Sequence, residues 1–107
     1  MTRLANIHPG EVLREEFLTP LNITPYLLAK SIGVQQTRIS AILEGKRAIT
    51  VDTALRLGRY FHVTPQFWLN LQQMYDLENE EQNPKHAASY EKIQGYQERT
   101  DTCAVAR

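Results

Sequence analysis

TPYLLAKSIGVQQTRISAILEGKR, residues 24–47, reads as two short helices separated by a tight turn. Thr24 can act as the N-cap of the first helix, and Pro25 suits the first helical position, where its missing N–H costs nothing. Gly33 follows the last apolar residue of that helix, where a left-handed backbone is usually needed. The second helix is expected over about 35–43. The stretch therefore predicts a tightly turned pair of helices.

Each expected helix carries an apolar stripe at helical spacing. The stripes consist of Leu28, Ala29 and Ile32 in the first helix, and of Ile39, Ile42 and Leu43 in the second. The exposed start of the second helix is polar and nearly free of carboxylates: Gln35, Gln36, Thr37, Arg38 and Ser40. A helix that enters the major groove of DNA requires such a surface.

The order of framework residues in this stretch resembles the helix-turn-helix of phage-repressor-like, XRE-type regulators. The positions that carry the resemblance are Ala29, Gly33, Val34, Ile39 and Ile42. By that resemblance, the residues that read base edges include Gln35, Gln36, Thr37 and Ala41, and Ser40 lies on the same polar face. The alternative is an ordinary helical hairpin with a polar outer face.

Cations near the second helix are the expected contacts to DNA phosphates. Lys46 and Arg47 stand in a short loop just beyond that helix, followed in rank by Arg38 and then Lys30. Each phosphate neutralised should add about 0.9 to the slope of log K against log salt. The alternative for these cations is a solvated surface loop.

The length and composition of the chain limit its class. A chain of 107 residues with 42% apolar and 22% charged residues is expected to be one small globular domain, with room for a tail. The single cysteine, Cys103, permits no disulfide within the chain, and no apolar run approaches membrane length. We therefore expect a cytoplasmic protein with no membrane association.

Catalytic and metal-binding residues are not grouped in the sequence. His8, His62 and His86 lie far apart and have no ligand spacing with Cys103, so we expect neither a metal site nor a cofactor. Glu15 and Glu16 are neighbours on a helix and point in different directions, which argues against a catalytic pair. We do not expect an enzyme.

The net charge of zero conceals an asymmetry. Residues 1–75 hold eight Lys or Arg and five Asp or Glu, whereas residues 76–107 hold four and seven. The first part is therefore mildly basic and the second acidic, as expected if a basic face meets phosphate and the acidic tail stays away from it.

Three more helices are expected around the central pair, which makes the fold all-α. They span about 10–18, ended by Pro20; 51–62, capped by Thr50 or Asp52; and 66–80. In the 51–62 helix, Leu55 and Phe61 are among the expected core residues, while Arg56 and Arg59 are expected to face outward.

The 66–80 helix has more apolar residues than one buried stripe needs. The excess predicts a two-fold dimer contact through Phe67, Trp68, Leu71 and Tyr75, although Trp68 can equally fill the core of a single copy. Residues 1–80 are expected to form the DNA-binding and dimerisation domain. Residues 81–107 are expected to be a weakly ordered polar tail, with a short helix possible over 87–97 on Tyr90, Ile93 and Tyr96.

Two further stretches resemble the HigA-type antitoxins, also grouped with VapI-like proteins. They are HPGEVLREEFLTPLNIT, residues 8–24, and VTPQFWLNLQQMYDL, residues 63–77. With the central pair they extend the similarity over about residues 7–77, and within the family the chain is similar to the antitoxins of GraTA-type pairs. The resemblance implies five helices and a homodimer that binds a pseudo-palindromic operator. It also implies that the dimer neutralises a small basic, RelE-like ribonuclease toxin.

Two questions stay open at the level of sequence. A stand-alone repressor without a toxin partner, or an interaction module that no longer binds DNA, would share many of these features. The surface that would hold a toxin has two candidates. One is the tail, with Tyr90, Ile93, Tyr96 and Val105; the other is the N-terminal region, with Arg3, Leu4, Ile7, Arg14 and Phe17.

Overall fold

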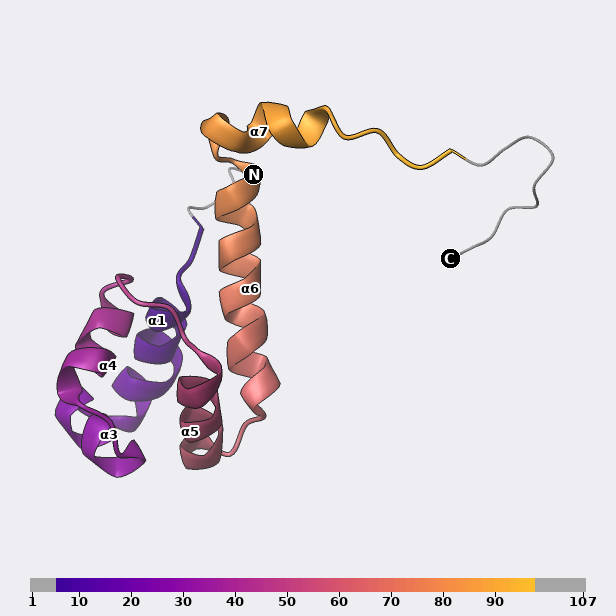
Figure 1. Ribbon diagram of the computed structural model, residues 1–107. Helices are drawn as coiled ribbons and strands as arrows, with labels where there is room; N and C mark the ends of the chain where they lie inside the picture. Colours follow the sequence, from indigo (N-terminus) through magenta and orange to yellow (C-terminus); the bar gives the residue numbers. More distant parts are fainter. Residues whose placement is uncertain (1–5, 98–107) are drawn as a thin grey trace.

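The computed structural model describes residues 6–97, and every regular element in that part is helical (Figure 1). A continuous helical stretch opens it: α1 (Pro9–Val12), the π-helical η1 (Leu13–Leu18) and α2 (Thr19–Leu21). The others are α3 (Pro25–Ile32), α4 (Gln36–Leu43), α5 (Val51–Phe61), α6 (Pro65–Glu81) and α7 (Pro84–Glu91). With the opening stretch counted as one helix, residues 6–97 contain six helices. The predicted count of five is therefore wrong, and the additional helix is α7.

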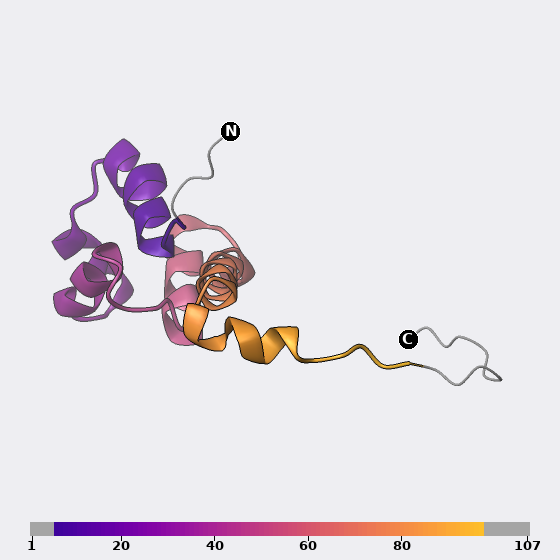
Figure 2. The same ribbon diagram turned by 90° about the horizontal axis from the view of Figure 1, so that it is seen from above.

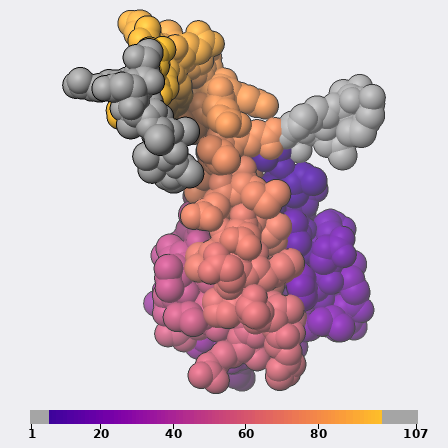
Figure 3. Space-filling view, turned by 90° about the vertical axis from the view of Figure 1, so that its right-hand side faces the viewer, coloured from indigo at the N-terminus to yellow at the C-terminus, as the bar shows by residue number. Residues whose placement is uncertain are grey.

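The helices α1 to α5 gather at one end of the long α6, and α7 turns away at its other end (Figures 1 and 2). The outer side of α6 lies uncovered along much of its length in Figure 3. The predicted short helix of the tail occurs earlier than expected, because α7 ends at Glu91 and residues 93–97 have no regular structure. Cys103 and the rest of 98–107 lie outside the described residues.

The sequence predicts that the opening helix ends before Pro20, but the helix does not end there. It continues to Leu21 because the preceding turns widen into a π-helix, in which the Thr19 N–H donates to the Arg14 carbonyl oxygen five residues earlier. A proline ring normally clashes with the carbonyl four residues before it, and a π-helical widening moves that carbonyl aside. The left-handed Asn22 (φ 59°) then ends the helix.

Trp68 is the largest completely buried side chain of the described core. Its ring lies 5.0 Å from the rings of Phe17 and Phe67 and 6.3 Å from that of Phe61, centroid to centroid. Such aromatic pairs add about 0.5–1.5 kcal/mol each beyond their buried area. Because no surface of Trp68 is left for a second copy, the prediction that it contacts one is wrong. Leu55, predicted to face the core, is instead exposed.

Threonines cap three of the helices. Thr24, Thr50 and Thr64 each accept a hydrogen bond through the side-chain oxygen from the backbone N–H three residues later. The predicted cap at Thr24 is confirmed, and Thr50 rather than Asp52 caps α5. Each such cap typically contributes about 1 kcal/mol.

The start of the first helix packs directly against the end of α4. Gly10 is buried there, and a Cβ atom built on it would lie 1.9 Å from the Ile42 carbonyl oxygen. The His8 Nδ1 accepts a hydrogen bond from the Gly10 N–H at 2.9 Å and so fixes this first turn. Burial lowers the pKa of His8, which favours the neutral ring that can accept this bond.

Gly10→Ala should lower the free energy of unfolding by about 3 kcal/mol, the upper end of overpacking costs, because the added methyl meets backbone that cannot rotate away. Thermal unfolding followed by circular dichroism measures the effect. Gly95→Ala is the matched control, since a Cβ at Gly95 meets no atom within 4 Å. A wild-type melting temperature for Gly10→Ala would contradict the close approach of the two helices.

Candidate nucleic-acid interface

The polar start of α4 projects from the domain. Gln35 is the N-cap residue, so the helix begins at Gln36, one residue later than predicted. The Gln35 side chain makes no capping hydrogen bond and is exposed, as are Gln36 and Thr37. Ser40 and Ala41 follow on the helix and are half-buried. Amide and hydroxyl groups that are not used for capping are therefore presented together at a helix N-terminus, whose dipole favours anions.

The turn before α4 fixes its direction relative to α3. Gly33 adopts the predicted left-handed conformation (φ 77°). Its N–H and that of Val34 both donate to the Ala29 carbonyl oxygen, at 2.9 and 3.0 Å. The carbonyl of Ala29 is thus paired twice, and the chain reverses within a few residues. Ala29 itself is buried, as the close crossing of the helices requires.

A charged cluster joins the three helices around this turn. The Asp52 carboxylate, on α5, accepts from Arg38 Nη1 of α4 at 2.7 Å and from Arg56 Nε at 3.1 Å. Arg56 also donates through Nη1 to the Ile32 carbonyl oxygen at 2.8 Å, which caps the end of α3. The hydrogen bonds from Arg38 and then Arg56 hold the pKa of Asp52 below its usual value. Arg56 is exposed, as predicted, and it is also a structural link between helices, which was not predicted.

The predicted phosphate-binding cations differ in how free they are. Arg38 is held by Asp52, so part of its charge is already compensated. Lys46 lies 3.4 Å from the Glu44 carboxylate but keeps most of its side chain in solvent, where such pairs contribute little. Arg47 and Lys30 are exposed and form no ion pair within residues 6–97.

The loop that carries Lys46 and Arg47 is anchored to α6. Ile49 is buried, and its N–H donates to the side-chain oxygen of Gln72 at 2.8 Å. The Gln72 amide nitrogen in turn donates to Asp76 at 3.0 Å, which orients the buried amide. Sequence reasoning missed this contact, because nothing in the local pattern distinguishes Gln72 from the exposed Gln73.

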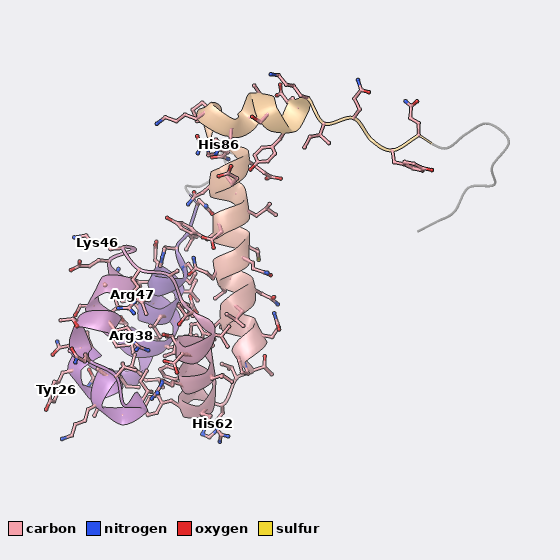
Figure 4. The ribbon with its side chains drawn as sticks, viewed as in Figure 1. Tyr26, Arg38, Lys46, Arg47, His62 and His86 are labelled. Carbon is pink, nitrogen blue, oxygen red and sulfur yellow. The ribbon has the colours of Figure 1, made fainter. Side chains whose placement is uncertain are left out.

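Figure 4 shows Tyr26, Arg38, Lys46 and Arg47 on the side of the domain formed by α3, α4 and the following loop, away from α6. Tyr26 was not predicted. It stands in the first turn of α3 with 60% of its surface exposed, and a tyrosine hydroxyl is one of the side-chain groups that bond to DNA phosphates. Its signal in the sequence was an aromatic residue immediately after a helix-starting proline.

The other predicted dimer residues lie along α6. Phe67 is exposed, whereas Leu71 and Tyr75 are half-buried, and the Tyr75 ring packs edge-on against His8 at 4.7 Å. Two apolar residues that were not predicted for the interface are more open: Met74 is 66% and Leu77 is 62% exposed. The apolar excess of this helix is therefore real, but it lies further toward its C-terminal end than the sequence indicated.

Within residues 6–97, no three His, Cys, Asp or Glu side chains are grouped so that they could hold a metal ion. In the same range no helix is long and apolar enough to cross a membrane.

The chain is similar to known proteins over most of its length. A helix-turn-helix family model matches residues 13–68. "Virulence-associated protein I" of Dichelobacter nodosus is 52% identical over 77 residues, which cover 72% of this chain and 71% of that protein. "Antitoxin HigA-1" of Vibrio cholerae is 37% identical over 76 residues, 71% of each chain.

A solved structure agrees with these matches. The Pseudomonas aeruginosa antitoxin HigA, determined with the higBA promoter, is 39% identical, covers 83% of this chain and 96% of its own, and superposes with a TM-score of 0.77. The family match spans the helical pair, its turn and the buried Trp68. This chain therefore belongs to the XRE-type helix-turn-helix family, a family of DNA-binding regulators rather than enzymes, and its relatives include HigA- and GraA-type antitoxins.

Proposed function

We propose that this protein is the antitoxin of a type II toxin–antitoxin system, which represses its own operon by binding operator DNA and neutralises a RelE-like ribonuclease toxin. The observation that carries the DNA half is the start of α4, where Gln35, Gln36 and Thr37 are exposed and not used for capping. A relative of the same fold was solved with promoter DNA, which supports DNA binding by this chain.

The side chains of α4 suit direct reading of bases. A glutamine amide can pair with both the N6 and N7 groups of adenine in the major groove, and such a pair contributes about 1–3 kcal/mol of discrimination. Ser40 and Ala41 lie deeper, where a hydroxyl or a methyl can contact a base edge. The flanking phosphates are then contacted by Lys46 and Arg47 on one side of α4 and by Lys30 on α3. Arg38 becomes a further contact if its side chain leaves Asp52.

A homodimer would place two copies of α4 on one face of the duplex. Recognition helices about 34 Å apart match successive major grooves and require a pseudo-palindromic operator. The surface proposed to pair the two copies is the side of α6 with the exposed Phe67 and the half-buried Leu71 and Tyr75. Gln72 of α6 is bonded to the loop that carries Lys46 and Arg47. Pairing through α6 would therefore also fix the spacing of the two DNA-binding surfaces.

Gln35→Ala combined with Gln36→Ala should abolish operator preference and leave weak non-specific binding, since the phosphate contacts stay in place. A gel-shift assay against competitor DNA measures the ratio of the two affinities. The matched control is Gln94→Ala with Gln97→Ala, two exposed glutamines beyond α7. Unchanged discrimination in the α4 variant would rule out its role in base reading.

Lys46→Ala combined with Arg47→Ala should weaken binding to all DNA sequences, because the cations that neutralise the flanking phosphates are removed. The slope of log K against log salt should fall by about 0.9 for each phosphate that is no longer neutralised. The control variant Lys85→Ala with Lys92→Ala removes the same charge from the other end of the molecule and should keep the wild-type slope. An equal decrease of the slope in both variants would show that net charge, and not this loop, determines the salt dependence.

The toxin half of the proposal predicts that a gene beside this one encodes a small basic protein, and that protein is the reagent for the test. Co-expressed with the affinity-tagged antitoxin, it should co-purify in a stable complex, and its ribonuclease activity should be absent until the complex is dissociated. A chain that binds its operator but retains no such protein is a stand-alone repressor, and this half of the proposal would then be withdrawn.

A further inference from the structure

The corner between α6 and α7 forms an open groove of about 430 Å³, lined by Leu77, Glu80, Glu81, Ala87, Tyr90 and Glu91. Its two large apolar lining residues are exposed: Leu77 keeps 62% and Tyr90 keeps 50% of its surface in solvent. Exposed leucine and tyrosine side chains that line one groove are typical of a binding site.

The shape of this groove is fixed by side chains of the protein itself. Glu80, near the end of α6, accepts from the Tyr90 hydroxyl at 2.6 Å and pairs with His86 Nδ1 at 2.6 Å, so both partners on α7 meet one carboxylate. The hydrogen bond from Tyr90, and next that from His86, lowers the pKa of Glu80. The carboxylate therefore stays ionised and keeps α7 at its angle to α6 at neutral pH.

The rim of the groove is strongly acidic. Three of its six lining residues carry carboxylates, and residues 76–91 as a whole contain five carboxylates and a single lysine. Glu80 is bonded to a tyrosine hydroxyl and a histidine, and Asp76 to the neutral amide of Gln72, so hydrogen bonds rather than lysines or arginines hold these two carboxylates. Glu81 and Glu91 form no ion pair within residues 6–97. A ligand for this site must combine an apolar surface with positive charge.

We propose that the α6–α7 groove docks a basic amphipathic segment of the toxin, an inference that rests on the antitoxin function proposed above. Apolar side chains of the segment cover Leu77 and Tyr90, and its Lys or Arg side chains face Glu81 and Glu91. Figure 4 shows α7 with His86 beyond the end of the domain that carries Arg38 and Tyr26, so a toxin held there leaves the DNA-binding surface open.

Two other assignments fit the structure less well. A second copy of this chain would bring the same acidic rim against this one, and like charges repel. At the N-terminal surface two of the predicted anchors are used within the domain: Arg14 donates to the Leu43 carbonyl oxygen at 2.6 Å, and Phe17 packs on Phe61 and Trp68. Ile7 stays exposed there, while Arg3 and Leu4, like Val105 of the tail, lie outside the described residues.

The test measures the affinity of the purified toxin for the full-length antitoxin by calorimetry at two salt concentrations. Glu81→Lys with Glu91→Lys should weaken binding at least tenfold and remove most of its salt dependence. Leu77→Gln removes the apolar contact without a change of charge and should weaken binding about tenfold. All three positions are exposed, so the melting temperature and operator binding should stay those of the wild type.

Matched controls separate the groove from general charge and from dimerisation. Glu15→Lys with Glu16→Lys makes the same charge change on the first helix, and Leu55→Gln replaces a similarly exposed leucine; both should bind the toxin as the wild type does. Wild-type affinity in both groove variants would overturn the docking site. The docking site would also be overturned if the charge reversals at Glu81 and Glu91 and at Glu15 and Glu16 weakened toxin binding equally. A Leu77→Gln variant that changes its oligomeric state but still binds the toxin would overturn it too. If the unmodified antitoxin does not bind the toxin at all, the proposed function fails first, and the two failures are thereby distinguished.

Discussion

The proposed DNA-binding surface depends on the left-handed turn at Gly33. Because this residue has a φ of 77°, α4 leaves α3 in a direction that an L-amino acid with a side chain rarely permits. The double hydrogen bond to the Ala29 carbonyl closes the turn, and Arg56 pairs the Ile32 carbonyl at the end of α3 from the neighbouring helix. The angle of α4 is thus determined by backbone geometry and then locked by one arginine, so its first side chains project at a fixed place.

The same arginine connects the turn to the electrostatics of the surface. Asp52 lies between Arg56, which is structural, and Arg38, which stands on α4, and accepts hydrogen bonds from both. A carboxylate so close to the proposed DNA-binding surface would repel phosphate if it were free, but two guanidinium groups neutralise it. The pairing therefore explains how an acidic residue is compatible with this position. Within the described residues, Arg38 is the predicted phosphate contact with the shortest ion pair, at 2.7 Å to Asp52. Lys46 lies 3.4 Å from Glu44, and Arg47 and Lys30 form no ion pair there.

Local signals in the sequence predicted most of the helices, and contacts between distant residues account for the errors. The threonine caps, Gly33 and the polar start of α4 are determined within a few residues, so they could be predicted. Pro20 misled the prediction because the π-helical widening before it is not visible in residue preferences. The contacts that Gln72, Arg56 and Trp68 make were not predicted for a different reason. Their partners Ile49, Ile32 and Phe17 lie far away along the chain, and no pattern within a helix reports such a partner.

The long α6 is the element that relates the two ends of the molecule. Its first turns carry the buried Trp68, its middle holds the loop of Lys46 and Arg47 through Gln72, and its last turns carry Leu77 and Glu80 to the groove with α7. A single helix therefore contacts the core, the loop proposed to bind phosphate and the acidic groove in succession. These three contacts lie on successive parts of the helix. The apolar side chains of α6 beyond one buried stripe therefore need not all belong to one interface. The inner part stabilises the domain, while the outer part, with Met74 and Leu77, is exposed and can meet other chains.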